Sequence, residues 1–183
     1  MNVFVLNAGR CGSTTFIRAC RHIDNYSAAH ESRLRLTGPQ RLAYPADHIE
    51  ADNRLSWLLG RLERAYGDDA FYVHLRRERD ASARSFARRA DFGIMQAYRE
   101  GILLGGQGQD AEEIALDYLD TVESNIALFL DGKTRVMDFR LEHARQDFRR
   151  FWQAIDATGD LERALAEWDV RYNASPDRLR HEP

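Results

Sequence analysis

The stretch "NVFVLNAGRCGSTTFIRAC", residues 2 to 20, decides how the chain is organised. Its apolar run, Val3 to Leu6, is typical of a buried strand and stops at a small polar residue. Two glycines then bracket an arginine and a cysteine, and a Ser-Thr-Thr run begins a helical pattern. The first amide groups of a helix have no intrahelical partner, so a strand, a glycine loop and a helix in this order indicate an anion site.

The loop departs from the phosphate loop of nucleotide triphosphatases, G-x-x-x-x-G-K-[ST]. Asn7 stands where the first glycine belongs, and Ser13 stands where the lysine belongs. The cation is instead Arg10, two residues before Gly12. A small P-loop nucleotide kinase therefore remains only an alternative, because a lysine normally holds the β- and γ-phosphates.

Each residue of the loop has a physical use around an anion. Gly9 and Gly12 allow the backbone to curl closely. Ser13 and Thr14 add hydroxyl donors, and Arg10 presents a planar guanidinium that matches phosphate or sulfate oxygens.

Composition sets the broad class. The chain has 183 residues, 44% of them apolar and 30% charged, which is ordinary for one globular domain spanning residues 1–183. A net charge of −3 gives no reason to expect nucleic acid or membrane as a partner. The local basic cluster "RRERDASARSFARR", residues 76 to 89, favours a small anion instead.

Targeting and metal signals are absent from the sequence. The N-terminus has no basic region before its short apolar run, and the two cysteines, Cys11 and Cys20, cannot build a disulfide framework. This pattern indicates a reducing, cytoplasmic setting. No cluster of histidines and cysteines has metal-ligand spacing, so no metal is expected.

The remaining pattern predicts an α/β fold, a three-layer structure with a mostly parallel sheet and flanking helices. Buried strands are expected at residues 3–6, 71–75 and 135–139, with a weaker one at 26–30. Helices are expected at residues 13–21, 53–66, 80–90, 110–130, 141–157 and 161–168, the second with Asn53 as its cap. Long loops at residues 32–47 and 101–110 interrupt this alternation and are expected to be functional.

The segment "GRCGSTTF" resembles the 5′-phosphosulfate loop of the sulfotransferases, which bind 3′-phosphoadenosine 5′-phosphosulfate (PAPS). The resemblance implies a P-loop-containing nucleotide hydrolase-like fold and a PAPS-dependent enzyme whose product is adenosine 3′,5′-bisphosphate. The loop residues it assigns to donor binding are Gly9, Arg10, Cys11, Gly12, Ser13, Thr14 and Thr15.

A second motif extends the resemblance. The family has an arginine at the end of a later strand and a serine eight residues on, which together hold the 3′-phosphate. Here "FYVHL" leads into Arg77, and Ser85 follows at that spacing. Arg79 replaces the family's usual proline, which leaves Arg76 as an alternative to Arg77.

The resemblance also implies donor contacts near the C-terminus, in "DVRYNASPDRLR". Arg171, Asn173 and Ser175 are the candidates there. A simple Asn-Ala-Ser-Pro turn is an equally good interpretation of the same residues.

Sulfuryl transfer is an in-line displacement that needs positioning and charge stabilisation. The transferred group carries less charge than a phosphoryl group, so the chemistry does not demand a metal. Arg10 would stabilise the leaving phosphate, and a general base must accept the proton of the acceptor. We expect Glu31 to be this base, with His30 either orienting it or replacing it.

The acceptor is expected to be a hydroxyl or amine on a small molecule or carbohydrate, between walls formed by residues 32–47 and 90–110. No pattern specifies the acceptor or an oligomeric state. Because the chain is short for a sulfotransferase, a non-catalytic nucleotide- or anion-binding module of the same fold is the remaining alternative.

Three further predictions concern single residues. His74, inside an apolar strand, is expected to be a hydrogen-bonded core histidine. Trp57, Trp152 and Trp168 are expected in the core, with Trp57 also a candidate to stack on adenine. Cys11 begins a helix, where a lowered thiol pKa is plausible.

Overall fold

The computed structural model describes residues 1–170 and residue 172. Its centre is a five-stranded sheet with the order β2-β3-β1-β4-β5, in which every strand pairing is parallel. This confirms the predicted fold class. The strands are β1 (Val3–Leu6), β2 (Ser27–His30), β3 (His48–Ala51), β4 (Phe71–Arg76) and β5 (Val136–Arg140).

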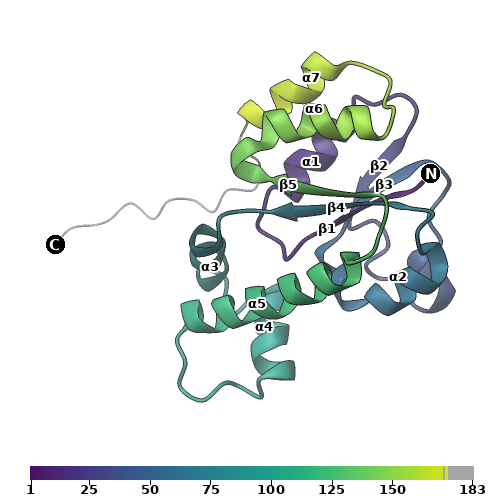
Figure 1. Cartoon of the computed structure of the whole chain (residues 1–183). Helices are drawn as coiled ribbons and strands as arrows, with labels where there is room; N and C mark the ends of the chain where they lie inside the picture. Colours follow the sequence, from purple (N-terminus) through teal and green to yellow (C-terminus); the bar gives the residue numbers. More distant parts are fainter. Residues whose placement is uncertain (171, 173–183) are drawn as a thin grey trace.

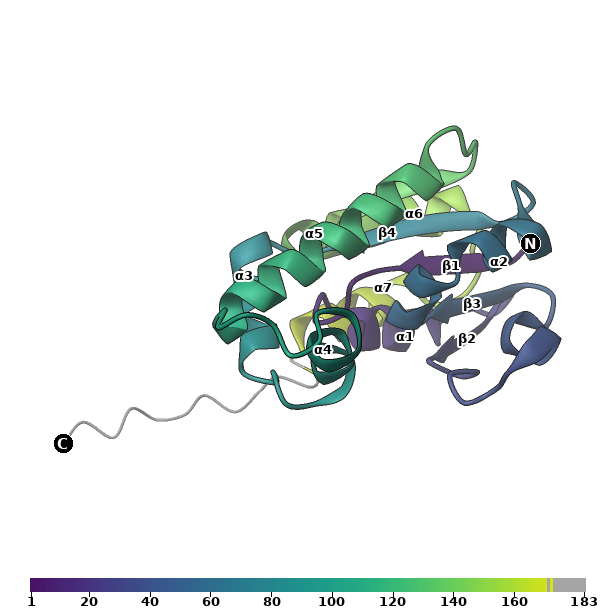
Figure 2. The same cartoon turned by 90° about the horizontal axis from the view of Figure 1, so that it is seen from below.

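Helices cover both faces of the sheet and make three layers (Figure 1). The upper layer holds α1 (Ser13–Cys20), α6 (Ala144–Ala154) and α7 (Leu161–Ala166). The lower layer holds α2 (Leu59–Tyr66), α3 (Arg79–Ala87), α4 (Gly93–Ala97) and α5 (Ala111–Leu130), with α3 packed along α5 (Figure 2). Five shorter helical segments are η1 (Gly38–Leu42), η2 (Asn53–Trp57), the π-helix η3 (Tyr98–Ile102), η4 (Leu141–His143) and η5 (Glu167–Asp169).

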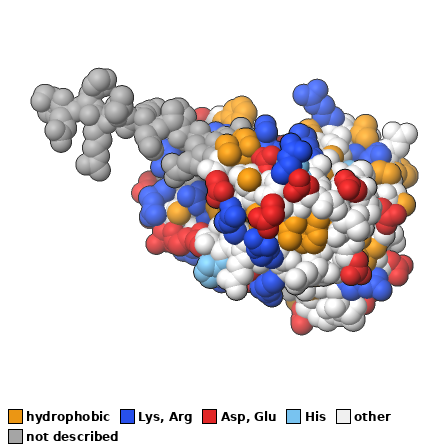
Figure 3. Space-filling model, turned by 90° about the horizontal axis from the view of Figure 1, so that it is seen from above, with side chains coloured by type: hydrophobic (Ala, Val, Ile, Leu, Met, Phe, Trp, Pro, Cys, Tyr) orange, Lys and Arg blue, Asp and Glu red, His pale blue; other side chains and the backbone are white. Residues whose placement is uncertain are grey.

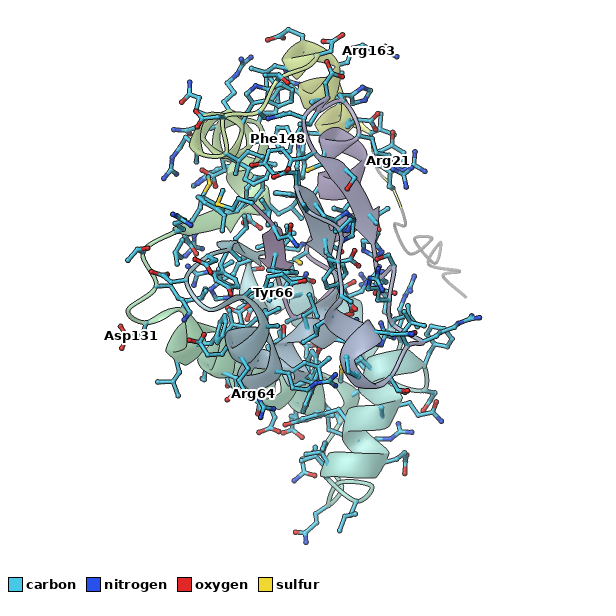
Figure 4. All side chains as sticks on the ribbon, turned by 90° about the vertical axis from the view of Figure 1, so that its right-hand side faces the viewer. Arg21, Arg64, Tyr66, Asp131, Phe148 and Arg163 are labelled. Atoms are coloured by element: carbon cyan, nitrogen blue, oxygen red, sulfur yellow. The ribbon has the colours of Figure 1, made fainter. Side chains whose placement is uncertain are left out.

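The central strand β1 divides the core in two. Successive side chains of a strand point to opposite faces, so Val3 and Val5 pack under the upper layer while Phe4 and Leu6 pack on the lower one. Phe148 of α6 belongs to the first cluster and Tyr66 of α2 packs against the second; both are labelled in Figure 4. Burial on both faces explains why β1 is a continuous apolar run.

The longest helix has a clear start signal. Asp110 caps α5 and forms a capping box with Glu113, as expected of a helix predicted to begin at residue 110. Farther along the helix, the Tyr118 hydroxyl donates a hydrogen bond of 2.7 Å to the carbonyl oxygen of Ala8. Helix α5 therefore supports the glycine loop from below.

The structure corrects the predicted elements at three places. Strand β3 was not predicted, because His48 and Glu50 interrupt an apolar pattern that would have marked a buried strand. The predicted helix 53–66 is broken into η2 and α2, and Asp52 caps η2 in place of Asn53. Helices α4 and η3 fill part of the expected wall at residues 90–110.

The surface carries both signs of charge. On the face above α1, α6 and α7, basic and acidic side chains are interspersed (Figure 3). Among the described residues, no helix combines the length and apolar content that a bilayer crossing requires.

Candidate functional site

The carboxyl ends of the parallel strands meet at one edge of the sheet, on the left in Figure 1 where β4 runs into α3. A cleft of about 280 Å³ opens beside the loop after β1. Ligands of open α/β sheets usually bind at this edge. The lining residues are Gly9, Arg10, Ser13, Thr14, His30, Glu31, Asn53, Arg54, Phe86, Arg89, Phe92, Gly93, Ile94 and Met95.

The loop after β1 is a tight left-handed turn. Gly9, Arg10 and Gly12 have positive φ angles of 100°, 58° and 92°. A Cβ atom on Gly12 would lie 2.7 Å from Cδ1 of Leu141. The second glycine is therefore needed for both its backbone conformation and the space beside it, and it is the N-cap of α1.

The two sequence motifs converge on Arg10. Its Nε donates a hydrogen bond of 3.1 Å to Oγ of Ser85, and Nη1 of Arg77 donates one of 3.4 Å to the carbonyl oxygen of Arg10. Residues separated by about seventy positions in the chain thus meet at one point. Arg76 lines the same small pocket as Arg77, but its guanidinium pairs with Asp138, with Nε 2.9 Å from Oδ1.

Positive charge accumulates around this point. Burial lowers the pKa of Arg10, and the neighbouring guanidinium groups of Arg89, Arg77 and Arg88 lower it further. Within residues 1–170 and 172, no carboxylate forms an ion pair with Arg77, Arg88 or Arg89. The positive charge that Arg77, Arg88 and Arg89 add beside Arg10 suits an anion with several negative charges.

His30 is the last residue of β2 and Glu31 follows it, so the two base candidates are adjacent in the chain. Nε2 of His30 is 3.0 Å from Oγ of Ser13, so it contacts the glycine loop directly. Glu31 has a positive φ of 52° and forms an ion pair of 3.2 Å with Nη1 of Arg54. The structure therefore brings both candidates to the same cleft as Arg10.

Several predicted donor-binding side chains do not line the cleft: Arg77 borders a separate pocket, and the side chains of Ser85, Cys11 and Thr15 are buried. Cys11 is buried, with Sγ 3.5 Å from Oδ1 of Asn7, and Thr15 is buried within α1. Burial raises the pKa of the Cys11 thiol to about 12, so the idea of a lowered thiol pKa was wrong. Cys11 and Thr15 can contribute only backbone groups to an anion.

Two other predictions also need correction. His74 is buried, but among the described residues its Nε2 has no hydrogen-bond partner, and it lies 3.9 Å from Oε2 of Glu123. Trp57 is 39% exposed and packs near Tyr118, whereas Trp152 and Trp168 pack in the upper core as predicted. Propensity alone could not reveal that the ring of Trp57 sits at the edge of the lower layer.

Sequence reasoning missed four lining residues, Asn53, Arg54, Phe86 and Arg89. Asn53 and Arg54 were taken as helix-start residues, and Arg89 as part of a solvated helix face. Asn53 and Arg54 follow β3, and Arg89 follows the Arg77–Ser85 motif. Their closeness to the glycine loop can be inferred only when the order of the strands in the sheet is known.

The C-terminal candidates Arg171, Asn173 and Ser175 lie outside the described residues. Tyr172 is described: its hydroxyl donates to Glu167 over 2.6 Å and the guanidinium of Arg18 stacks on its ring. In the described ranges, no group of three or more histidine, cysteine, aspartate or glutamate side chains has a metal-binding arrangement.

No protein-family model matches the sequence, and no curated protein sequence matches it. The fold, however, is similar to solved structures. A sulfotransferase domain from the curacin biosynthetic pathway superposes with a TM-score of 0.60 at 14% identity, over 87% of this chain and 75% of that domain. The mouse sulfotransferase SULT7A1, solved in complex with PAP, gives a TM-score of 0.48 at 11% identity, over 94% of this chain and 60% of the mouse protein. At 14% identity the first comparison shows a shared fold, the three-layer α/β architecture with a parallel sheet.

Proposed function

We propose that this protein is a PAPS-dependent sulfotransferase that moves a sulfuryl group to a hydroxyl or amine acceptor. The observation that carries the proposal is the convergence of Arg77 and Ser85 on Arg10 at the glycine loop. If both motifs belong to one donor site, the glycine loop and the Arg77–Ser85 pair must be close in space. The hydrogen bonds of Arg10 with Ser85 and Arg77 meet this requirement. The shared fold is consistent with this proposal.

In this proposal the donor spans two anion sites. The loop amides, with Ser13 and Thr14, hold the 5′-phosphate at the start of α1, where the helix dipole favours negative charge. Arg77 and Ser85 hold the 3′-phosphate. Arg77 is the better choice than Arg76, because Arg76 is already engaged with Asp138.

The transfer breaks the bond between sulfur and the bridging phosphate oxygen and forms a bond between sulfur and the acceptor oxygen or nitrogen. Arg10 stabilises the charge that develops on the leaving phosphate. The acceptor proton passes to a base in the cleft. We assign this role first to His30, which contacts Ser13, since Glu31 is held in an ion pair with Arg54.

The proposal is tested by binding of adenosine 3′,5′-bisphosphate. We expect this nucleotide to raise the melting temperature of the wild-type protein, and Arg77→Ala to remove most of the shift. Arg76→Ala is the matched control, because it deletes the neighbouring guanidinium that pairs with Asp138. Absence of a shift at millimolar nucleotide, or an equal loss in both variants, would contradict the proposed donor site.

A measurement of sulfuryl transfer distinguishes a sulfotransferase from a non-catalytic binding module of the same fold. We expect transfer from PAPS to at least one member of a panel of phenols, aliphatic alcohols, amines and sugars. His30→Asn should reduce that rate while the bisphosphate still binds. Bisphosphate binding with no transfer to any acceptor would favour the module.

A further inference from the structure

Three ionisable residues lie along one face of β3 and its extension, a strand that the sequence did not predict. His48, Glu50 and Asp52 alternate with other residues, so their side chains share one face. They are 6%, 0% and 0% exposed. We call these residues the β3 polar stripe. Burying such groups is costly unless each one is hydrogen-bonded, so their partners must matter.

The partners of the β3 polar stripe come mainly from the segment that follows β2. His48 Nδ1 lies 2.8 Å from Oγ of Ser27, and Asp52 Oδ2 accepts a hydrogen bond of 2.5 Å from Nη2 of Arg41. The ring of Tyr44 stacks on His48. Residues 31–47 are thus fastened to the sheet at several points by polar contacts.

Glu50 contacts Ser32, the residue that follows the two base candidates in the chain. Its Oε1 accepts a hydrogen bond of 2.7 Å from the backbone N–H of Ser32, and its Oε2 accepts one of 2.7 Å from the Ser32 hydroxyl. Nε2 of His48 lies 3.0 Å from the same Oε2. Both carboxylate oxygens are therefore satisfied, and two of the three donors belong to a single residue.

Ser32 directly follows the two base candidates. Its neighbour Glu31 adopts a left-handed conformation with φ of 52°, which costs a non-glycine residue about 1 kcal/mol. The N–H of Glu31 donates to the carbonyl oxygen of Ala51 over 3.0 Å. The turn that aims His30 and Glu31 is consequently held on one side by the β3 backbone and on the other by the Glu50 carboxylate.

We infer that Glu50 is a positioning residue that fixes the conformation of the His30–Glu31 pair in the cleft. The effect of Glu50 on catalysis rests on the proposed function, in which His30 or Glu31 is the general base. Glu50 itself is fully buried and does not line the cleft. It acts through Ser32, by holding the turn in the one conformation that keeps His30 against Ser13.

The test uses Glu50→Gln in the full chain. The substitution replaces one carboxylate oxygen by an NH2 group, which donates hydrogen bonds. The two terminal atoms of the substituted side chain therefore cannot both accept, one from the N–H and the other from the hydroxyl of Ser32. Because Arg41 and Asp52 still fasten the same segment, we expect the variant to fold. Ser32→Ala removes the hydroxyl contact, while Ser32→Thr retains it and should behave like wild type.

Ser27→Ala is the matched control, since Ser27 contacts His48 of the same stripe but not Ser32. We expect hydrogen exchange at the Ser32 amide to be about tenfold faster in Glu50→Gln, and unchanged in Ser27→Ala. The imidazole resonance of His30 should shift in Glu50→Gln and Ser32→Ala only. With an acceptor from the panel above, kcat should fall about tenfold while the Kd of the bisphosphate stays within about twofold.

The two levels of the inference fail separately. If Glu50→Gln leaves both the Ser32 amide protection and the His30 resonance at wild-type values, the positioning role is overturned, whatever the enzyme does. If those two signals change but kcat does not, the conformation of the turn has no effect on the reaction rate. That result also overturns the inference. If wild type does not bind the bisphosphate, the proposed function fails, while exchange and resonance still decide whether Glu50 holds the turn.

Discussion

The two sides of the cleft handle charge in opposite ways. On the donor side, Arg77 and Arg89 form no ion pair with any carboxylate in the part of the chain that the structure describes. On the acceptor side, Glu31 is paired with Arg54 and His30 with Ser13. A side with excess cations is organised to receive an anion, whereas a side whose groups satisfy one another holds its geometry before any ligand arrives.

The largest effect should follow removal of the donor-side cation at the loop. We expect Arg10→Ala to weaken binding of adenosine 3′,5′-bisphosphate by about 100-fold or more, because charge-assisted hydrogen bonds contribute about 1.5–3 kcal/mol each. Arg54→Ala, on the acceptor side, should change the same affinity by less than about threefold. Isothermal titration of both variants measures the contrast, and equal losses would show that the two sides do not differ in this way.

The next effect concerns His74 in β4, which should make the stability of the folded protein depend on pH. Burial lowers the pKa of His74 to about 4 from its usual value near 6.5, so the folded state favours the neutral ring. The unfolded chain then binds more protons between pH 6.5 and pH 4, and about 2–3 kcal/mol of stability is lost as the pH falls through this window. Urea unfolding of His74→Leu should show a flatter pH dependence there.

Glu123 moderates this effect in the wild-type protein. Burial raises the pKa of Glu123, so its own contribution to stability is present at low pH and is lost as the pH rises. The wild-type slope is therefore smaller than the contribution of His74 alone. A pH dependence that is identical in wild type and His74→Leu would contradict the assignment to His74.

A smaller effect on stability is expected when a glycine of the loop, Gly12, and a glycine of a helix, Gly60, are each replaced by alanine. Gly12→Ala places a Cβ atom 2.7 Å from the side chain of Leu141 at a φ of 92°, and we expect about 1–2 kcal/mol of destabilisation. Gly60→Ala in α2 meets no atom within 4 Å, and alanine favours a helix, so stability should rise by up to about 1 kcal/mol. Equilibrium unfolding of the two variants should give opposite signs.

The smallest effect is expected at the acceptor-side ion pair. The side chains of Arg54 and Glu31 are 37% and 29% exposed, so water screens their attraction. We expect Arg54→Ala to change the free energy of unfolding by no more than about 0.5 kcal/mol. A loss of several kcal/mol in equilibrium unfolding would show that this pair stabilises the fold as well as the cleft.

The donor side could be anticipated from sequence to a large extent. The strand at residues 3–6 and the helix from residue 13 were placed by local pattern, and Arg77 and Ser85 by the resemblance to a family; the structure brings both the arginine and the serine to Arg10. Each signal is short and contiguous, because glycines, hydroxyls and helix starts act within a few residues. The same local view failed for Cys11, whose burial depends on the helices packed around it.

The acceptor side shows the opposite outcome. His30 and Glu31 were identified as candidates, but the strand that supports them, β3, was not predicted, and neither was Arg54 as a lining residue. The stripe of His48, Glu50 and Asp52 looks like surface sequence. Its hydrogen-bond partners come from distant positions, Ser27 in β2 and Ser32 and Arg41 in the segment after it.

By itself the sequence determined the alternation of strands and helices, the glycine loop and the residue types that suit a doubly charged donor, because hydrophobic periodicity and turn chemistry are local. The tertiary structure alone decided which cations gather at the loop, which acids are neutralised and how Glu50 reaches Ser32. These outcomes depend on strand order and on contacts between distant segments, and the free energy of a buried charge is set by the partners that such contacts provide.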